Sequence, residues 1–107
     1  MKPWRLTRRA ERSLVDIFAW TIEQFGERQA IAYRDALIER IEIIAQGQPP
    51  HPRPCGLLLQ GHASDDDLVY YREGGHYILM RDSEDALIVL EFFHQATDLP
   101  RHLQTLG

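Results

Sequence analysis

The chain has 107 residues, of which 44% are hydrophobic and 26% charged, and its net charge is −4. These values predict a single globular domain with one core. No apolar run reaches the roughly 20 residues of a membrane span, and the acidic balance argues against a domain that depends on an overall basic surplus to hold phosphates. The lone cysteine, Cys55, excludes an internal disulfide. The N-terminal residues lack a signal-peptide pattern, so we expect a cytoplasmic protein.

The first half of the chain predicts a short strand and then two helices. Lys2–Leu6 alternates apolar and polar residues, and Thr7 is a suitable N-cap for a helix over Arg8–Phe25. Gly26 should end that helix, and a second one should cover about Glu27–Gln46. A link of about one residue forces the helices into an antiparallel pair. Their combined apolar stripe is too wide for them to cover each other, so it predicts a contact with a sheet.

The segment Gln48–Asp67 is rich in proline and acidic residues and predicts a loop, with Leu57-Leu58-Leu59 against the core. Near the end of the chain, Asp98 and Pro100 predict the start of a short helix that continues to Leu106.

Two strands, Leu68–Glu73 and His76–Asp82, flank Gly74-Gly75, which is a strong signal for a two-residue hairpin turn. The predicted opposing pairs are Glu73 and His76, Arg72 and Tyr77, Tyr71 and Ile78, Tyr70 and Leu79, Val69 and Met80, and Leu68 and Arg81. One face of this hairpin is mainly apolar, whereas the other mixes tyrosines with two arginines. We look for function on that second face.

The third strand of this region, Ala86–Phe93, is apolar except for Glu91, which predicts a strand in the interior of the sheet. The whole order is β-α-α-β-β-β. It predicts an α+β domain in which the N-terminal strand and a helical hairpin pack on one face of a curved, mainly antiparallel sheet. The position of Lys2–Leu6 in the sheet stays open.

A set of local signatures spread over nearly the whole chain resembles a known family. They are Ala10, Phe25-Gly26, Gln29-Ala30, Tyr33, Leu68–Arg72, Gly75–Ile78, Arg81, His94, Asp98, Pro100, Arg101, His102 and Leu103. In order and spacing these residues resemble the ParE toxins of the RelE/ParE superfamily. The proline-rich and acidic loop departs most from that pattern.

The resemblance implies a toxin of a type II toxin–antitoxin pair. Such a toxin is held inactive by a ParD-like or similar antitoxin, whose disordered C-terminal segment wraps over its sheet and helices. A dimeric antitoxin would then give a heterotetramer. ParE toxins are poisons of DNA gyrase, whereas RelE-like relatives cleave messenger RNA on the ribosome. The fold alone does not choose between these activities.

RNA cleavage would need a proton acceptor, a proton donor and cations, for which the candidates are His94, Arg72 and Arg81. Lys2 is the only lysine, and the net charge is negative, so we expect a protein that acts by binding. Arg72 and Arg81 could equally form ion pairs or receive carboxylates of the antitoxin. The predicted antitoxin-binding residues are Trp20, Arg72, Arg81, Phe92 and Phe93, and the predicted target contacts are His94, Arg101 and His102.

We expect no metal and no cofactor, because His51, Cys55 and His62 match no standard ligand spacing. Tyr70, Tyr71 and Tyr77 could stack on bases, but cross-strand pairing is their expected use. Three hypotheses follow: a gyrase-directed ParE toxin, a RelE-like ribonuclease, and an inactive relative that only binds its antitoxin.

Overall fold

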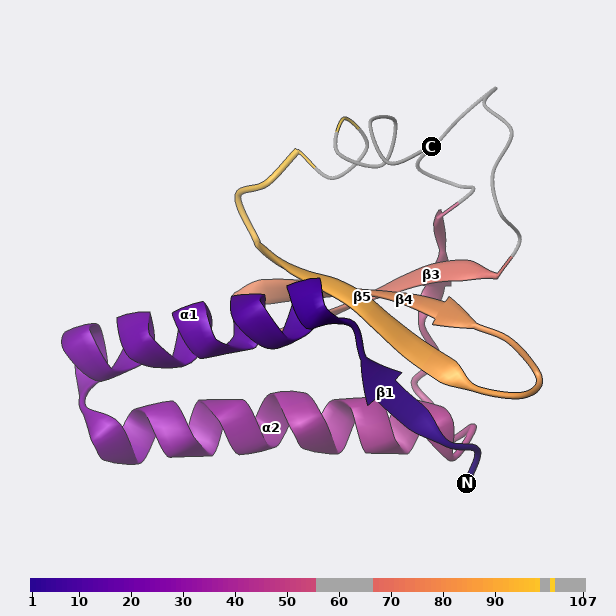
Figure 1. The fold of residues 1–107 in the computed structure, drawn as a ribbon, viewed down its shortest axis with the longest axis horizontal. Coiled ribbons are helices and arrows are strands. Elements are labelled where there is room, and N and C mark those ends of the chain that lie inside the picture. Colours follow the sequence, from indigo (N-terminus) through magenta and orange to yellow (C-terminus); the bar gives the residue numbers. More distant parts are fainter. Residues whose placement is uncertain (56–66, 99–100, 102–107) are drawn as a thin grey trace.

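The computed structural model describes residues 1–55, 67–98 and 101. Its elements are β1 (Trp4–Leu6), α1 (Arg8–Phe25), α2 (Glu27–Ala45), β2 (Arg53–Pro54), β3 (Leu68–Glu73), β4 (His76–Asp82) and β5 (Leu87–His94). The five strands form one sheet in the order β1-β5-β4-β3-β2, and the antiparallel helices cover one of its faces (Figure 1). The predicted α+β architecture is therefore confirmed. Neither described helix is long and apolar enough to cross a membrane.

The hairpin predicted around the two glycines is confirmed in full. All six predicted pairs of β3 and β4 occur, from Glu73 opposite His76 to Leu68 opposite Arg81. Gly74 has φ +57°, a left-handed conformation that glycine adopts without steric cost. A residue with a side chain would be strained at this position.

Strand β5 lies in the interior of the sheet, as its apolar sequence predicts. It pairs antiparallel with β4 and parallel with β1, which settles the position of the N-terminal strand. A bulge between β4 and β5 sets Leu79 opposite Glu91 and Met80 opposite Val89, so that Leu90 is the extra residue.

The short strand β2 was not predicted. Its two residues pair with Val69 and Tyr70 at the edge of the sheet. The prolines of this segment favour a loop, but proline is tolerated in an edge strand because its missing N–H is not needed there. Leu57-Leu58-Leu59 and most of the predicted C-terminal helix lie outside the described residues.

Both helices begin and end close to the predicted residues. The Thr7 hydroxyl accepts a hydrogen bond from the Ala10 N–H at 3.1 Å, and it donates to the Leu90 carbonyl at 2.9 Å. Gly26, with φ +94°, ends α1 and begins α2. Thr7 therefore both caps α1 and joins it to β5.

The main core lies between the helical hairpin and the sheet. Its fully buried members include Leu37 and Ile41 of α2 and Ile78, Met80 and Val89 of the sheet. A second, smaller cluster lies on the opposite face of the sheet. There Cys55 and Leu79 are buried among partly buried Leu68, Tyr70, Tyr77, Leu90 and Phe93.

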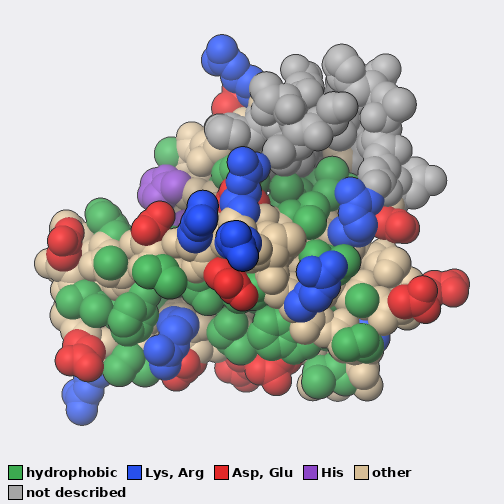
Figure 2. Space-filling model, in the orientation of Figure 1, with side chains coloured by type: hydrophobic (Ala, Val, Ile, Leu, Met, Phe, Trp, Pro, Cys, Tyr) green, Lys and Arg blue, Asp and Glu red, His purple; other side chains and the backbone are tan. Residues whose placement is uncertain are grey.

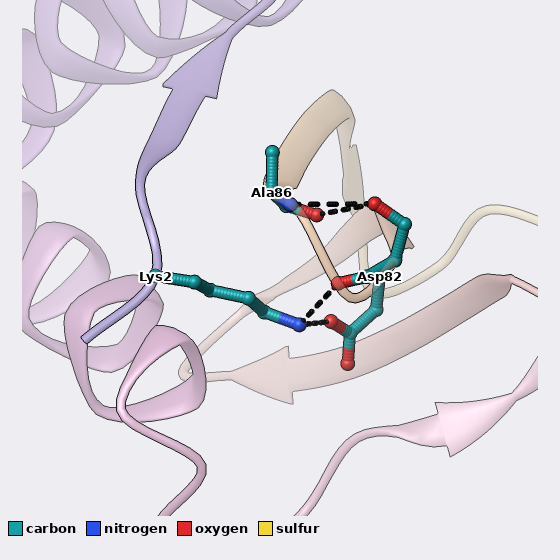
Figure 3. A network of polar contacts seen from close by, with 4 residues as sticks. Lys2, Asp82 and Ala86 are labelled. Atoms are coloured by element: carbon teal, nitrogen blue, oxygen red, sulfur yellow. Dashed lines mark hydrogen bonds and ion pairs between the residues drawn. The ribbon is translucent and has the colours of Figure 1, made fainter.

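The N-terminus is tied to the turn between β4 and β5 (Figure 3). The Lys2 ammonium forms an ion pair with Asp82 and donates a hydrogen bond to the Ser83 carbonyl at 2.7 Å. The Ser83 hydroxyl in turn bonds to Ala86, which closes the turn. The single lysine of the chain thus has a structural partner.

Candidate functional site

The tip of the β3–β4 hairpin is joined to α2 by the phenol of Tyr33. Its oxygen lies 2.7 Å from His76 Nδ1, accepts the Gly75 N–H at 3.1 Å and lies 3.2 Å from the Glu73 carbonyl oxygen. All three contacts are satisfied together if Nδ1 of His76 carries the proton and donates to the phenol, which donates to Glu73. Burial raises the pKa of Tyr33, with the Gly75 N–H acting in the opposite direction.

Two histidines lie directly opposite each other beside this contact. His76 and His94 are register partners on β4 and β5, and their rings are edge to face with centroids 5.7 Å apart. Burial lowers the pKa of His76, and the neighbouring His94 lowers it further because two imidazolium charges would repel. His94 itself is exposed, and its Nδ1 accepts the Ala96 N–H at 3.1 Å.

The residues proposed for a ribonuclease do not form one cluster. His94 pairs with His76, whose contact with Tyr33 places both on the helical side of the sheet. Arg72 is the register partner of Tyr77, which belongs to the cluster on the opposite face. Arg81 lies on that same opposite face, four residues along β4 from Tyr77, a separation of about 13 Å. The side chain that faces His94 across the strands is thus another histidine.

Arg72 nevertheless reaches the end of β5 near His94. Its guanidinium bonds to the Gln95 side chain and donates to the Gly74 carbonyl at 3.4 Å. Neither of these partners is a carboxylate. Glu73, next to Arg72 in sequence, points to the other face and forms a 2.8 Å ion pair with Arg40, which also lies over the Tyr71 ring at 4.9 Å.

The aromatic residues predicted to bind an antitoxin have three different environments. Trp20 is 51% exposed on α1, with its ring edge to face with Phe25 at 6.0 Å. Phe92 is 5% exposed and lies in the main core, so its side chain is not on the accessible surface. Phe93 is half-buried in the cluster on the opposite face of the sheet. Successive side chains of a strand point to opposite faces of the sheet, so Phe92 faces the helices and Phe93 faces away from them.

Two of the predicted target contacts come after the last strand. Arg101 is exposed, and its backbone N–H donates a hydrogen bond to the Asp98 carboxylate at 3.3 Å. His102 lies outside the described residues. The contacts of these residues with a target stay predictions.

Helix α1 carries an apolar surface that the core does not use. Val15 is 66% exposed, Phe25 59% and Ile22 39%. Figure 2 shows hydrophobic side chains gathered along the helical hairpin and basic side chains around the start of α1. A hollow of about 480 Å³ joins the two kinds of surface, since it is lined by Arg8, Glu11, Arg12, Val15 and Asp16.

The cysteine in the described part of the chain is unsuited to metal binding or nucleophilic chemistry. Cys55 is fully buried, and burial raises the pKa of its thiol to about 11. No group of three or more His, Cys, Asp or Glu side chains within residues 1–55, 67–98 and 101 is arranged to hold a metal ion.

Several residues of these surfaces were not found by sequence reasoning. Helical spacing is compatible with Tyr33 facing the core, but nothing in the local sequence indicates that it contacts His76, 43 positions away. His76 is not among the candidate residues that the sequence indicates, although the predicted register sets it opposite Glu73. Its pairing with His94 depends on the bulge between Leu79 and Met80, which shifts the register of β4 and β5 by one residue and has no signal in the local sequence.

Comparisons with known proteins agree with this architecture. A family model described as "ParE toxin of type II toxin-antitoxin system, parDE" matches residues 4–99. Toxin ParE1 of Caulobacter vibrioides is 37% identical over 84 residues, which cover 76% of this chain and 86% of that toxin. A solved structure described as the chromosomal ParDE TA system from P. aeruginosa matches with a TM-score of 0.66 and 12% identity. That match covers 88% of this chain and 96% of the other and shows a shared fold.

The fold is thus that of a small toxin domain with a helical hairpin on a mixed sheet. The chain belongs to the ParE toxin family of type II toxin–antitoxin systems.

Proposed function

We propose that this toxin is neutralised by direct binding of a ParD-like antitoxin and that it acts on DNA gyrase to block replication. The proposal of antitoxin binding rests on the exposed apolar side chains of α1, which are Val15 and Ile22 along one side of the helix and the contacting pair Trp20 and Phe25 near its end. A monomeric domain seldom leaves several large apolar side chains exposed on one helix without a partner. The proposal that the toxin acts on DNA gyrase is supported by its membership of the ParE family.

The chemistry of the partner segment follows from the charge beside that surface. Arg8 and Arg12 are exposed at the start of α1, and within the described residues neither forms an ion pair. An amphipathic helix with carboxylates at one end and apolar side chains along the rest would satisfy both parts of the surface. Trp20 is the expected anchor, because large aromatic side chains dominate binding energy at interfaces.

Antitoxin binding is tested by titrating purified toxin with its cognate antitoxin. Trp20→Ala and Val15→Asp should each weaken the affinity by at least tenfold, since one removes an anchor and the other buries a charge. Ala32→Asp is the matched control, because it adds the same charge at an exposed position of α2. Unchanged affinity in folded Trp20→Ala and Val15→Asp variants would contradict the proposed surface.

The target is tested by expression of the toxin without antitoxin, with plasmid supercoiling and bulk messenger RNA measured together. Altered supercoiling or gyrase-dependent DNA breaks with intact message is the expected result. Rapid loss of message would contradict it and support the ribonuclease alternative, for which His94 would then be the first residue to mutate. Normal growth with folded, soluble protein would support an inactive relative that only binds its antitoxin.

The ribonuclease alternative has less structural support. A transphosphorylation site needs its acid, its base and its cations around one phosphate. His94 lies on the helical side of the sheet. Arg72 comes from the opposite face and is held at the end of β5 by Gln95, and Arg81 lies on that opposite face away from both. We therefore place the toxic activity in binding.

A further inference from the structure

A pocket of about 520 Å³ lies at the edge of the sheet, away from the helical hairpin. It is lined by Pro50, His51, Arg53, Tyr70, Tyr71, Arg72 and Tyr77. Its volume falls within the range of about 300–1,000 Å³ that is usual for small-ligand sites. The unpredicted strand β2 supplies one wall, so this pocket exists only because Arg53–Pro54 adds to the edge of β3.

The strand register places two arginines and two tyrosines together in this pocket. Arg53 is the partner of Tyr70, and Arg72 is the partner of Tyr77. Tyr70 and Arg72 are two residues apart on β3 and share a face. Adjacent strands are about 4.8 Å apart, and alternate residues on a strand are about 7 Å apart. The two arginines therefore come from positions close enough to flank one ligand when the Arg72 guanidinium turns from Gln95, on the β5 side of β3, toward Arg53 on β2.

Both arginines are exposed and lack acidic partners within the described residues. Arg53 makes no ion pair there, and the Arg72 guanidinium contacts only an amide oxygen and a carbonyl. Two arginines of the helices are instead paired with carboxylates of the sheet: Arg40 with Glu73 and Arg9 with Glu91. Among the described residues, the pocket therefore carries positive charge that no acidic side chain pairs with, even though the whole chain is acidic. Planar guanidinium groups of this kind bind phosphate oxygens in a bidentate geometry.

The tyrosines add flat surfaces beside these cations. The rings of Tyr70 and Tyr77 are edge to face, with centroids 6.1 Å apart and planes at 68°. In such a pair, the ring that presents its edge keeps its own faces free of its partner. A planar base can stack on such a face, which is how single-stranded nucleic acids are commonly held.

We propose that this pocket binds a nucleotide, with the phosphate held by Arg53 and Arg72 and the base stacked on Tyr70 or Tyr77. The ligand is either a free nucleotide or one unit of a single strand, since both present the same phosphate and base. Binding involves no covalent step. The proposal does not depend on the antitoxin or on gyrase, and it concerns a different face from the apolar surface of α1.

The test is calorimetric titration of the full-length protein at low salt with AMP, dAMP, and six-residue oligo-rA and oligo-dA. Arg53→Gln and Arg72→Gln should each weaken nucleotide binding by roughly tenfold or more, because each removes charged hydrogen bonds to phosphate. Arg28→Gln, at an exposed position on α2, makes the same charge change away from the pocket and should alter binding less than twofold. Each pocket variant should also reduce the salt slope for the oligomers by about one.

The results distinguish a free nucleotide from a single strand, and they show whether the proposal itself is wrong. Equal affinity for monomer and hexamer would identify a free nucleotide, and tighter binding of a hexamer would identify a strand. No binding at millimolar ligand, or equal weakening by Arg28→Gln, would overturn the proposal. So would full affinity in pocket variants that fold normally by circular dichroism. Arg53→Gln should keep its antitoxin affinity, so a failure here is distinct from a failure of the proposed function.

Discussion

The Tyr33 phenol oxygen lies 2.7 Å from His76 Nδ1 and joins helix α2 to the tip of the β3–β4 hairpin across 43 positions of the sequence. The same oxygen accepts the Gly75 N–H, and the ring sits where a Cβ on Gly74 would be. One side chain therefore holds the turn and orients one of two facing histidines.

Removal of the phenol oxygen should destabilise the protein. Tyr33→Phe leaves the Gly75 N–H and the His76 ring without their partner, and the free energy of unfolding should fall by about 1–3 kcal/mol. Urea unfolding measures this change. Tyr70→Phe is the control, because its hydroxyl makes no hydrogen bond within the described residues. Equal stability of the two variants would contradict the role of Tyr33.

The two glycines of the turn should respond very differently to alanine. Gly74 has φ +57°, and an added Cβ would lie 2.6 Å from Tyr33 Cε1. The left-handed conformation alone costs about 1–2 kcal/mol for a residue with a side chain, and the contact adds to that cost. Gly75 has neither constraint, since no atom lies within 4 Å of its ideal Cβ. Gly74→Ala should therefore lower the urea midpoint well below that of Gly75→Ala, and similar midpoints would contradict the close approach of Tyr33.

The buried histidine should make stability depend on pH. Burial and the facing His94 lower the pKa of His76 below its usual 6.5, so the unfolded chain binds a proton that the folded chain does not. This contribution is present above pH 6.5 and is lost as the pH falls through the lower folded pKa. Wild-type protein should thus lose more unfolding free energy than His76→Gln between pH 7.5 and pH 5.5. If the unfolding free energies of the two proteins changed with pH in parallel, protonation of His76 would not be the cause of the change.

The thiol of Cys55 should be almost inert in the folded protein. Burial raises its pKa to about 11, so at pH 8 its thiolate fraction is lower than that of a free cysteine by two to three orders of magnitude. Reaction with a thiol reagent should be slow in buffer and fast in denaturant. A rapid reaction in buffer would mean that β2 and the residue after it open readily. The rate therefore reports on the edge strand that forms one wall of the proposed nucleotide pocket.

Much of this architecture is determined locally and was predictable from the sequence. Thr7 and Gly26 set the ends of α1 because a capping hydroxyl and a left-handed residue act on their immediate neighbours. Gly74-Gly75 fixed the register of β3 and β4, because a two-residue turn leaves only one set of opposing pairs. The apolar run of β5 indicated an interior strand, since a strand covered on both faces needs no polar alternation.

Only the tertiary structure decided the relationships between residues far apart in the chain. The partner of β1 and the addition of Arg53–Pro54 to the sheet edge depend on strands that no short turn connects. The pairing of His76 with His94 depends on the bulge that shifts the register of β4 and β5 by one residue. The reach of Tyr33 depends on how the helical hairpin sits on the sheet, which many packed side chains determine together. Local propensity fixes elements and their caps. The candidate surfaces arise where elements meet, and their geometry is set by packing of the whole domain.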